Sequence, residues 1–555
     1  MLLLGLIAVP VLLGALAALA GRERAFGVAL LGALAQLALA VVAAVQFPWG
    51  SADMAFDSRI EWLPELGLGL SVGVDSVSMM LILLTGLLGP ICVLASRSAI
   101  TERVRTYYAW LLILQGAMAG VFVARDVILF YICFEFTLIP MFILISLFGS
   151  TNRKKAAIKF FLYTFTGSVI ALAGLVYVAW RHAAEAGGQW TFDIMALEQT
   201  SRGLPMATQQ IVMFALLLGF AVKVPLFPFH TWLPLAHTEA PTAGSVVLAG
   251  VLLKLGTYGI FRFVLPFTPA AVAEHAPLLA TLCIVGILYG GLVCWVQTDV
   301  KKLVAYSSVA HLGFCMLGMF SLNRTGLQGS ILYMINHGLS TGALFLMIGM
   351  IYERYHTRNM KELGGLAARM PVWSTFMVFF VMASVGLPGL NGFISEFLCL
   401  LGAFQASSAW GSGIWGTLGA QVPGATGGNL GPWYAAVAGT GMIVAAMYLL
   451  YMVGKVVWGP LVEPGGHGNG HAAGHGSPDD HAHGVLPRDL TGREIGILIP
   501  LALLCLALGL YPKPLTDALE KPVSATVTTI DAARRAAAVM PEPGPGLIRE
   551  REGRP

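Results

Sequence analysis

The sequence predicts an all-α protein that crosses a membrane about fourteen times. Hydrophobic residues make up 57% of the 555 residues and charged residues only 11%, whereas soluble domains have roughly 45–50% and 25%. The mean hydropathy is +0.77. The apolar residues are also gathered into long runs, and a membrane-spanning helix needs about 20 of them in succession.

Fourteen runs of this kind can be placed along the chain. They lie at 2–20, 26–46, 74–96, 107–124, 126–148, 158–180, 207–235, 241–265, 277–297, 300–320, 326–351, 373–405, 433–458 and 494–511. The first run lacks the positive segment that begins a signal peptide, and Arg22 and Arg24 follow it instead. This order predicts a retained span with the N-terminus outside.

The loop charges support this count. With the N-terminus outside, six cations fall in outer loops, at Arg59, Arg125, Arg181, Arg202, Arg262 and Arg324. Fifteen fall in inner loops, at Arg22, Arg24, Arg97, Arg103, Arg105, Arg153, Lys154, Lys155, Lys159, Lys301, Lys302, Arg354, Arg358, Lys361 and Arg369. Inner loops of membrane proteins carry the excess of Lys and Arg. An even number of spans then places the C-terminus outside as well.

Two of the runs are interrupted. The seventh contains Pro225 and Pro228 directly after Lys223, and proline cannot donate to the helical hydrogen-bond ladder. The twelfth contains three glycines and a proline within 386–392. These spans are five apart, so spans 4–8 and 9–13 are interpreted as two five-helix repeats, inverted relative to each other. Paired interruptions of this kind mark ion pathways in transporters, while ordinary proline kinks are the alternative.

The chain is therefore divided into five parts. A three-helix segment at 1–106 precedes the first repeat at 107–266 and the second repeat at 277–460. A His- and Gly-rich loop at 461–493 follows, and 494–555 holds the last span and a polar tail. The loop contains His467, His471, His475, His481 and His483. We interpret it as a flexible cytoplasmic loop, with metal binding as the alternative.

Six titratable residues lie near the middle of predicted spans. They are Glu135, Lys223, Lys254, His311, His337 and Glu396. A charge at this depth costs at least about 2.5–3.5 kcal/mol and marks a functional site by default. Burial destabilises the charged form of a side chain, so buried lysines and carboxylates can exchange protons near neutral pH, and histidine does so without adjustment.

These residues predict a hydrated polar axis that carries protons along the middle of the membrane. Glu135 is the natural partner of Lys223, because each is the one mid-depth charge of its span. The alternatives are structural: a Glu–Lys pair that holds two helices together, and histidines that only form hydrogen bonds between helices. Nearer the inner surface, His237 and Glu239 either feed the axis or cap span 8.

Other sites are not indicated by the sequence. The seven cysteines lie singly in apolar segments, without the spacing of a disulfide framework, a metal site or an iron–sulfur site. No glycine-rich nucleotide-binding motif is present. No basic tract indicates a nucleic acid partner. We therefore expect no redox, nucleotide or metal cofactor to bind this chain.

Several segments resemble a known family. The run FAVKVPLFPFHTWLPLAHTEAPTAGS at 220–245, with KLGTYG at 254–259, resembles the signature of the antiporter-like subunits of respiratory complex I. Three further segments resemble its branch of bacterial subunit M and mitochondrial subunit 4: FEFTLIPM at 134–141, NHGLSTGALF at 336–345, and YERYHTR at 352–358 with LGGL at 363–366. The resemblance covers about residues 70–460. It departs at Leu235, where many bacterial relatives have Asp and where Glu239 is a nearby substitute.

The resemblance implies a fold of fourteen helices with inverted repeats around two interrupted helices. It implies a proton-translocating subunit in the membrane arm of a bacterial inner-membrane complex, next to sister antiporter-like subunits. NADH, flavin, iron–sulfur clusters and quinone would belong to other subunits. Glu135 and Lys223 would form the input half, Lys254 the central connector, His311 and His337 its extension, and Glu396 the terminal site toward the outside.

Two other functions compete with this one. A multisubunit cation/proton antiporter shares the lysine signature, and a membrane scaffold without transport would need none of the buried charges. The segments at 134–141 and 352–358 favour complex I.

Overall fold

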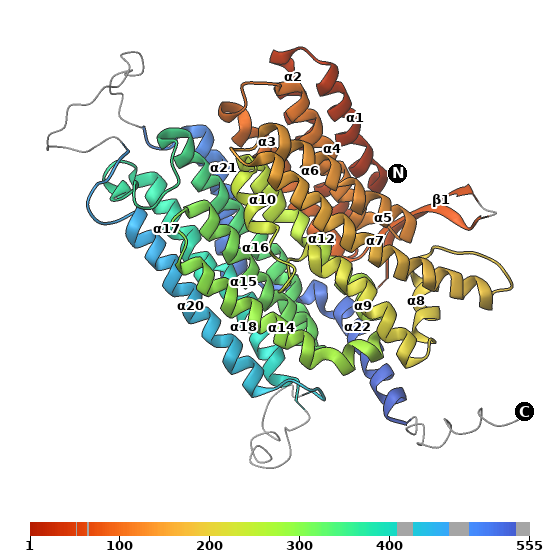
Figure 1. The fold of residues 1–555 in the computed structure, drawn as a ribbon. Coiled ribbons are helices and arrows are strands. Elements are labelled where there is room, and N and C mark those ends of the chain that lie inside the picture. The colour runs from red at the N-terminus through yellow and green to blue at the C-terminus, as the bar shows by residue number, and fades with distance from the viewer. Residues whose placement is uncertain (52, 64–65, 408–425, 465–487, 540–555) are drawn as a thin grey trace, which may run out of the picture.

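The computed structural model describes residues 1–51, 53–63, 66–407, 426–464 and 488–539 (Figure 1). The predicted histidine loop at 467–483 lies outside these residues. The first part of the chain forms helices α1 (Leu2–Leu19), α2 (Arg22–Gln46), α3 (Ser76–Ala99), α4 (Val104–Val123), α5 (Val127–Phe136), α6 (Leu138–Phe148), α7 (Arg153–Glu185), α8 (Ile194–Arg202), α9 (Met206–Lys223) and α10 (Leu233–Glu239).

One long helical segment follows, in which α-helical and π-helical turns alternate. It comprises α11 (Thr242–Val247), the π-helix η2 (Leu248–Leu252), α12 (Leu253–Gly259), the π-helix η3 (Ile260–Val264) and α13 (Leu265–Phe267). The remaining helices are α14 (Pro269–Trp295), α15 (Val300–Phe320), α16 (Arg324–Tyr355), the short 3-10 helix η4 (Leu366–Ala368), α17 (Pro371–Val385), α18 (Asn391–Gln405), α20 (Pro432–Val456), α21 (Gly492–Leu510) and α22 (Lys513–Val539).

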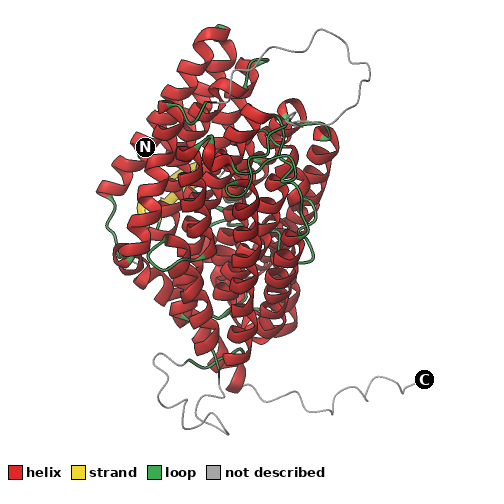
Figure 2. Cartoon of the chain, turned by 90° about the vertical axis from the view of Figure 1, so that its left-hand side faces the viewer, coloured by secondary structure: helices red, strands yellow, loops and turns green. Residues whose placement is uncertain are grey.

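The helices form a bundle in which most of them run in the same general direction (Figure 2). Within the described residues, thirteen helical segments are long and apolar enough to cross a membrane. They correspond to thirteen of the fourteen predicted runs. The other run, 373–405, is divided into α17 and α18, each of 15 residues, which is shorter than the roughly 20 residues a span needs.

The center of the bundle is more buried than its two sides. The segment Thr242–Phe267 and helix α16 are fully buried within their most apolar stretches, and α15 is nearly so. By contrast, α1, α2, α7, α20 and α21 bury less than half of theirs. In Figure 1 the red and orange helices α1, α2 and α4 lie on one side of the bundle, and helices α17 and α20 lie on the other.

A two-stranded hairpin departs from the predicted all-α fold. Strand β1 (Ala55–Leu63) pairs with β2 (Leu68–Val74) in an antiparallel register that joins Ala55 to Val74. A further bridge joins Val72 to Ala124 at the end of α4. The prediction missed the hairpin because it lies in a loop between two spans, where only the apolar runs were interpreted.

The tail after the last span is also more ordered than its composition suggested. Helix α22 is 27 residues long and contains Pro522. Its buried residues Leu519, Val523, Val527 and Ile530 recur at helical spacing, which gives the helix one apolar face. This face packs against α14 and α16. The prediction of a polar tail gave weight to the prolines and charges and overlooked this spacing.

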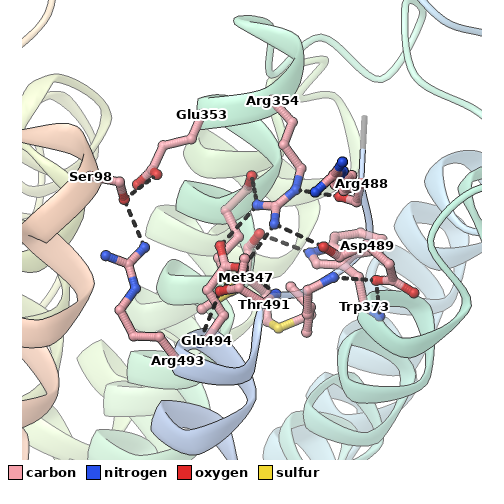
Figure 3. A network of polar contacts seen from close by, with 12 residues as sticks. Ser98, Met347, Glu353, Arg354, Trp373, Arg488, Asp489, Thr491, Arg493 and Glu494 are labelled. Carbon is pink, nitrogen blue, oxygen red and sulfur yellow. Dashed lines mark hydrogen bonds and ion pairs between the residues drawn. The ribbon is translucent and has the colours of Figure 1, made fainter. Parts of the chain in front are cut away.

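A polar cluster joins the start of α21 to the last turn of α16 and the first turn of α17 (Figure 3). We call its members Arg354, Asp489 and Glu494 the α21 clasp. The guanidinium of Arg354 makes a bidentate ion pair with Glu494, at 2.9 and 2.8 Å, and also donates to the carbonyls of Met350, Arg488 and Asp489. All five of its N–H groups are therefore used. The Asp489 carboxylate accepts from the first backbone N–H groups of α17, at Val372 and Trp373.

We expect Arg354→Ala to lower the unfolding temperature of the detergent-solubilised chain. The Glu494 side chain is only 5% exposed, and removing one partner of a buried ion pair costs about 3–5 kcal/mol. Arg493→Ala is the matched control, because Arg493 lies one residue away and donates instead to Ser98. Equal unfolding temperatures for the two variants would show that the clasp does not stabilise the fold.

Candidate functional site

The six titratable residues of the predicted axis lie on six different helical segments. Lys223, Lys254, His311, His337 and Glu396 are all buried, with exposures between 0% and 3%. Glu135 on α5 is half-buried. The structure brings Lys254, His337, His311 and Glu396 into one cluster. Lys223 and Glu135 lie in a second one.

Lys223 is the last residue of α9, where helical hydrogen bonding stops. The prolines that follow cannot continue the ladder, and the next helical turn begins at Leu233. The Val222 carbonyl, which the interruption leaves without its helical partner, accepts a hydrogen bond of 2.8 Å from the Trp232 indole. The interruption is therefore stabilised by side chains, and it places the Lys223 ammonium opposite α5.

Lys223 does not form the direct ion pair with Glu135 that we predicted. Among the described contacts, its Nζ donates to the Phe134 carbonyl at 3.0 Å and to the Thr137 hydroxyl at 3.4 Å. It also lies 3.4 Å from the centre of the Phe134 ring. These two partners flank Glu135 in sequence, at the end of α5 and directly after it.

Lys254 is fully buried, in α12 at the centre of the bundle. Its Nζ contacts the Ala249 carbonyl and lies 2.8 Å from His337 Nδ1. Ala249 belongs to the π-helix η2, and single π-turns inside helices often mark functional sites. The close approach depends on glycine, because a Cβ at Gly338 would lie 2.9 Å from the Gly250 carbonyl oxygen.

His337 and His311 continue this contact toward α18. Their ring centres lie 6.1 Å apart. His311 Nδ1 is 2.7 Å from the Tyr333 hydroxyl and 3.3 Å from Glu396 Oε1. The Tyr333 hydroxyl also donates to Glu396 Oε1 at 2.6 Å. A chain of polar groups therefore runs from Lys254 through both histidines to Glu396, and we call it the central axis.

The two candidates near the inner surface have different environments. The Glu239 carboxylate accepts a hydrogen bond of 2.8 Å from the backbone N–H of Asn152, at the start of α7. It therefore caps α7 and not span 8. His237 is fully buried and stacks on Phe345 with ring centres 4.6 Å apart, and neither of its ring nitrogens has a hydrogen-bond partner among the described residues.

Two buried polar residues near this site were not among the predicted candidates. Tyr333 joins His311 to Glu396, and its place one turn before His337 was a usable signal. Lys301 was counted among the loop charges, but it is only 6% exposed and donates to the Ala240 carbonyl at 2.6 Å. Its spacing of seven from Ser308 and ten from His311 places all three on one helix face, which the sequence alone would have shown.

We found no alternative site for a metal among the described residues. They contain no group of three or more His, Cys, Asp or Glu side chains placed to hold a metal ion. All seven cysteines are buried and free.

Comparison with known proteins identifies the family. Residues 124–420 match the family described as NADH:quinone oxidoreductase/Mrp antiporter, and 59–120 match the amino terminus of NADH-ubiquinone oxidoreductase chain 4. NADH-quinone oxidoreductase subunit M of Rhodobacter capsulatus is 38% identical over 521 residues, which is 92% of each chain. NADH-ubiquinone oxidoreductase chain 4 of Arabidopsis thaliana is 38% identical over 94% of this chain and 96% of its own length.

Solved structures agree in fold. A chain of respiratory complex I from Thermus thermophilus superposes with a TM-score of 0.78 at 29% identity, over 95% of this chain and 99% of that one. A chain of the Mrp complex from Dietzia sp. DQ12-45-1b reaches 0.75 at 21% identity, over 96% and 99%, and at that identity it shows the fold alone. Both the sequence and the fold therefore place this chain in the family of NADH-quinone oxidoreductase subunit M and NADH-ubiquinone oxidoreductase chain 4.

Proposed function

We propose that this chain translocates protons in the membrane arm of respiratory complex I, and that the central axis carries them. The observation that supports this most is the buried sequence of contacts from Lys254 through His337 and His311 to Glu396. Each member can hold or release a proton, and each is shielded from solvent. A structural staple would need one such pair and not four titratable groups in a row.

Each helix interruption, between α9 and α10 and between α17 and α18, lies next to a titratable residue of the proposed proton path. We propose that α9–α10 and α17–α18 are corresponding elements of two inverted five-helix repeats, spans 4–8 and 9–13. Lys223 ends α9 and Glu396 lies in the first half of α18, so each repeat contributes a titratable group next to its interruption. Lys254 lies between them in sequence, on the segment Thr242–Phe267, whose most apolar stretch is fully buried. Interrupted helices in corresponding positions are typical of ion pathways.

The energy for this transport comes from outside the chain. Moving one proton charge against 100 mV takes about 2.3 kcal/mol. We propose that NADH:quinone electron transfer in partner subunits, which hold the flavin, the iron–sulfur clusters and the quinone, supplies it. The other partners are the neighbouring membrane-arm subunits, including sister antiporter-like subunits. We place the protein in the bacterial inner membrane with both termini outside.

A subunit of a multisubunit cation/proton antiporter is the second candidate, because the fold also superposes on the Mrp complex. Purification from the native membrane separates the two functions. We expect the chain to copurify with NADH:quinone reductase activity and to acidify inverted vesicles on NADH addition. Copurification with small antiporter subunits, with sodium-driven proton movement and without NADH oxidation, would favour the antiporter instead.

Removing the charge of Lys223 or of Glu135 tests whether these two residues take part in proton transport. We expect Lys223→Ala and Glu135→Ala each to depress NADH-driven proton uptake into vesicles, and the electron transfer coupled to it, while the complex stays assembled. Lys223 binds the carbonyl of the residue that precedes Glu135, so the double variant should be no worse than the more severe single variant if both act in one step. Wild-type pumping in both single variants would reduce the region to a structural contact.

A further inference from the structure

A groove runs along the surface of the bundle between α7 and α9, which pack side by side (Figure 1). Its volume is about 1010 Å³. Its walls are apolar side chains of both helices and of the segment after α9, at Ile158, Leu162, Ile170, Leu218, Val222 and Phe229. The titratable residues of the proposed proton path do not line it.

One end of the groove is positively charged. Lys155 and Lys159 line it there, and the described residues around it include no carboxylate. Lys155 is exposed, and Lys159 is half-buried. The Lys159 ammonium donates to the Thr231 carbonyl at 2.8 Å, which uses one of its three N–H groups and leaves two for another acceptor. Arg153 and Lys154 precede them in α7 but line a separate hollow beside Glu102.

The apolar and cationic parts of the groove match the hydrocarbon and headgroup layers of a bilayer. Helix α7 is 33 residues long, and its outer face exposes Ile158, Leu162, Phe165, Val169 and Trp180, at 42% to 55%. A face of this kind contacts lipid hydrocarbon. The cations at the start of α7 then lie at headgroup level, on the side that the loop charges predict to be inside.

We propose that this groove binds one anionic phospholipid of the phosphatidylglycerol class. Its phosphate lies between Lys155 and Lys159, and its acyl chains follow the apolar walls toward Ile170 and Leu218. A cationic end whose described lining has no carboxylate favours a headgroup with net negative charge over a zwitterionic one, in which a cation already compensates the phosphate; basic pockets between transmembrane helices bind anionic headgroups in this way. A helix of a partner subunit would have to bring acidic residues to the same place.

Photocrosslinking from within the groove tests the proposal and does not depend on proton transport. Thr166 lines the groove and is exposed, so Thr166→p-benzoylphenylalanine places a reactive group beside the proposed acyl chains. The complex that contains this variant is reconstituted in nanodiscs of equal phosphatidylglycerol and phosphatidylcholine, irradiated and digested. Mass spectrometry then identifies the adduct on the peptide that contains residue 166.

We expect phosphatidylglycerol adducts to exceed phosphatidylcholine adducts several-fold. Lys155→Gln with Lys159→Gln should bring the ratio to that of the membrane, while Lys155→Arg with Lys159→Arg should preserve the preference. Lys302→Gln, which removes an exposed cation from α15, is the matched control and should change nothing. An equal ratio in the unaltered groove would overturn the selectivity, and an adduct to another polypeptide would show that a partner subunit fills it.

Discussion

Replacing Lys254 with methionine is expected to stop NADH-driven proton translocation while the complex stays assembled. Lys254 is fully buried, and its ammonium is the group that contacts His337 Nδ1 at 2.8 Å. Methionine has a similar length but can neither hold nor release a proton. Groups that transfer protons contribute roughly 10²–10⁴-fold to a rate, so we expect proton uptake into vesicles to fall on the order of 100-fold.

The fold is expected to tolerate this substitution. Methionine is similar to lysine in length and removes the cost of burying a charge, and the amount of assembled complex separates loss of activity from loss of structure. Lys302→Met is the matched control, because Lys302 is an exposed lysine at the start of α15. The measurements are vesicle acidification, NADH oxidation and the amount of assembled complex. Full acidification by the Lys254 variant would remove the central axis from the proton path.

The titratable residues of the site could be predicted from the sequence because each is conspicuous against an apolar background. Lys254 and Glu396 need no structure to be noticed, since the cost of burying a charge applies wherever the chain folds. The helices were predictable for the same reason. Their long apolar runs are required by the thickness of the bilayer, and helices α9 and α17 end next to the proline and glycine residues that the sequence places inside those runs.

The partners of these residues could not be predicted, because they depend on which helices are neighbours. The Lys254–His337 contact joins α12 to α16 and depends on a close backbone approach at Gly338. The missing Lys223–Glu135 bond illustrates the same limit. Single charges on two spans suggest a pair, but the interruption directs the ammonium to the Phe134 carbonyl instead. Glu239 was ambiguous in sequence because its acceptor role depends on the start of α7.

Replacing Glu396 with glutamine is the second change for which we expect a large loss. Glu396 is 2% exposed, and its Oε1 accepts from Tyr333 at 2.6 Å and lies 3.3 Å from His311 Nδ1. Glutamine keeps the size and the carbonyl acceptor for Tyr333 but has no titratable proton. We expect NADH-driven acidification to fall on the order of 100-fold, as for Lys254, with normal assembly. Normal acidification would show that Glu396 serves only as a hydrogen-bond acceptor.

Tyr333→Phe separates a transfer role for Glu396 from a structural one. The substitution removes one hydrogen bond to the Glu396 carboxylate, and hydrogen bonds to charged groups contribute about 1.5–3 kcal/mol. We therefore expect a partial loss of proton uptake, by roughly 10- to 100-fold. If Tyr333 acts through Glu396, adding Tyr333→Phe to the Glu396→Gln variant should cause no further loss, because the two changes then affect one step. Independent, multiplicative losses would instead mean that Tyr333 passes protons by a route that avoids Glu396.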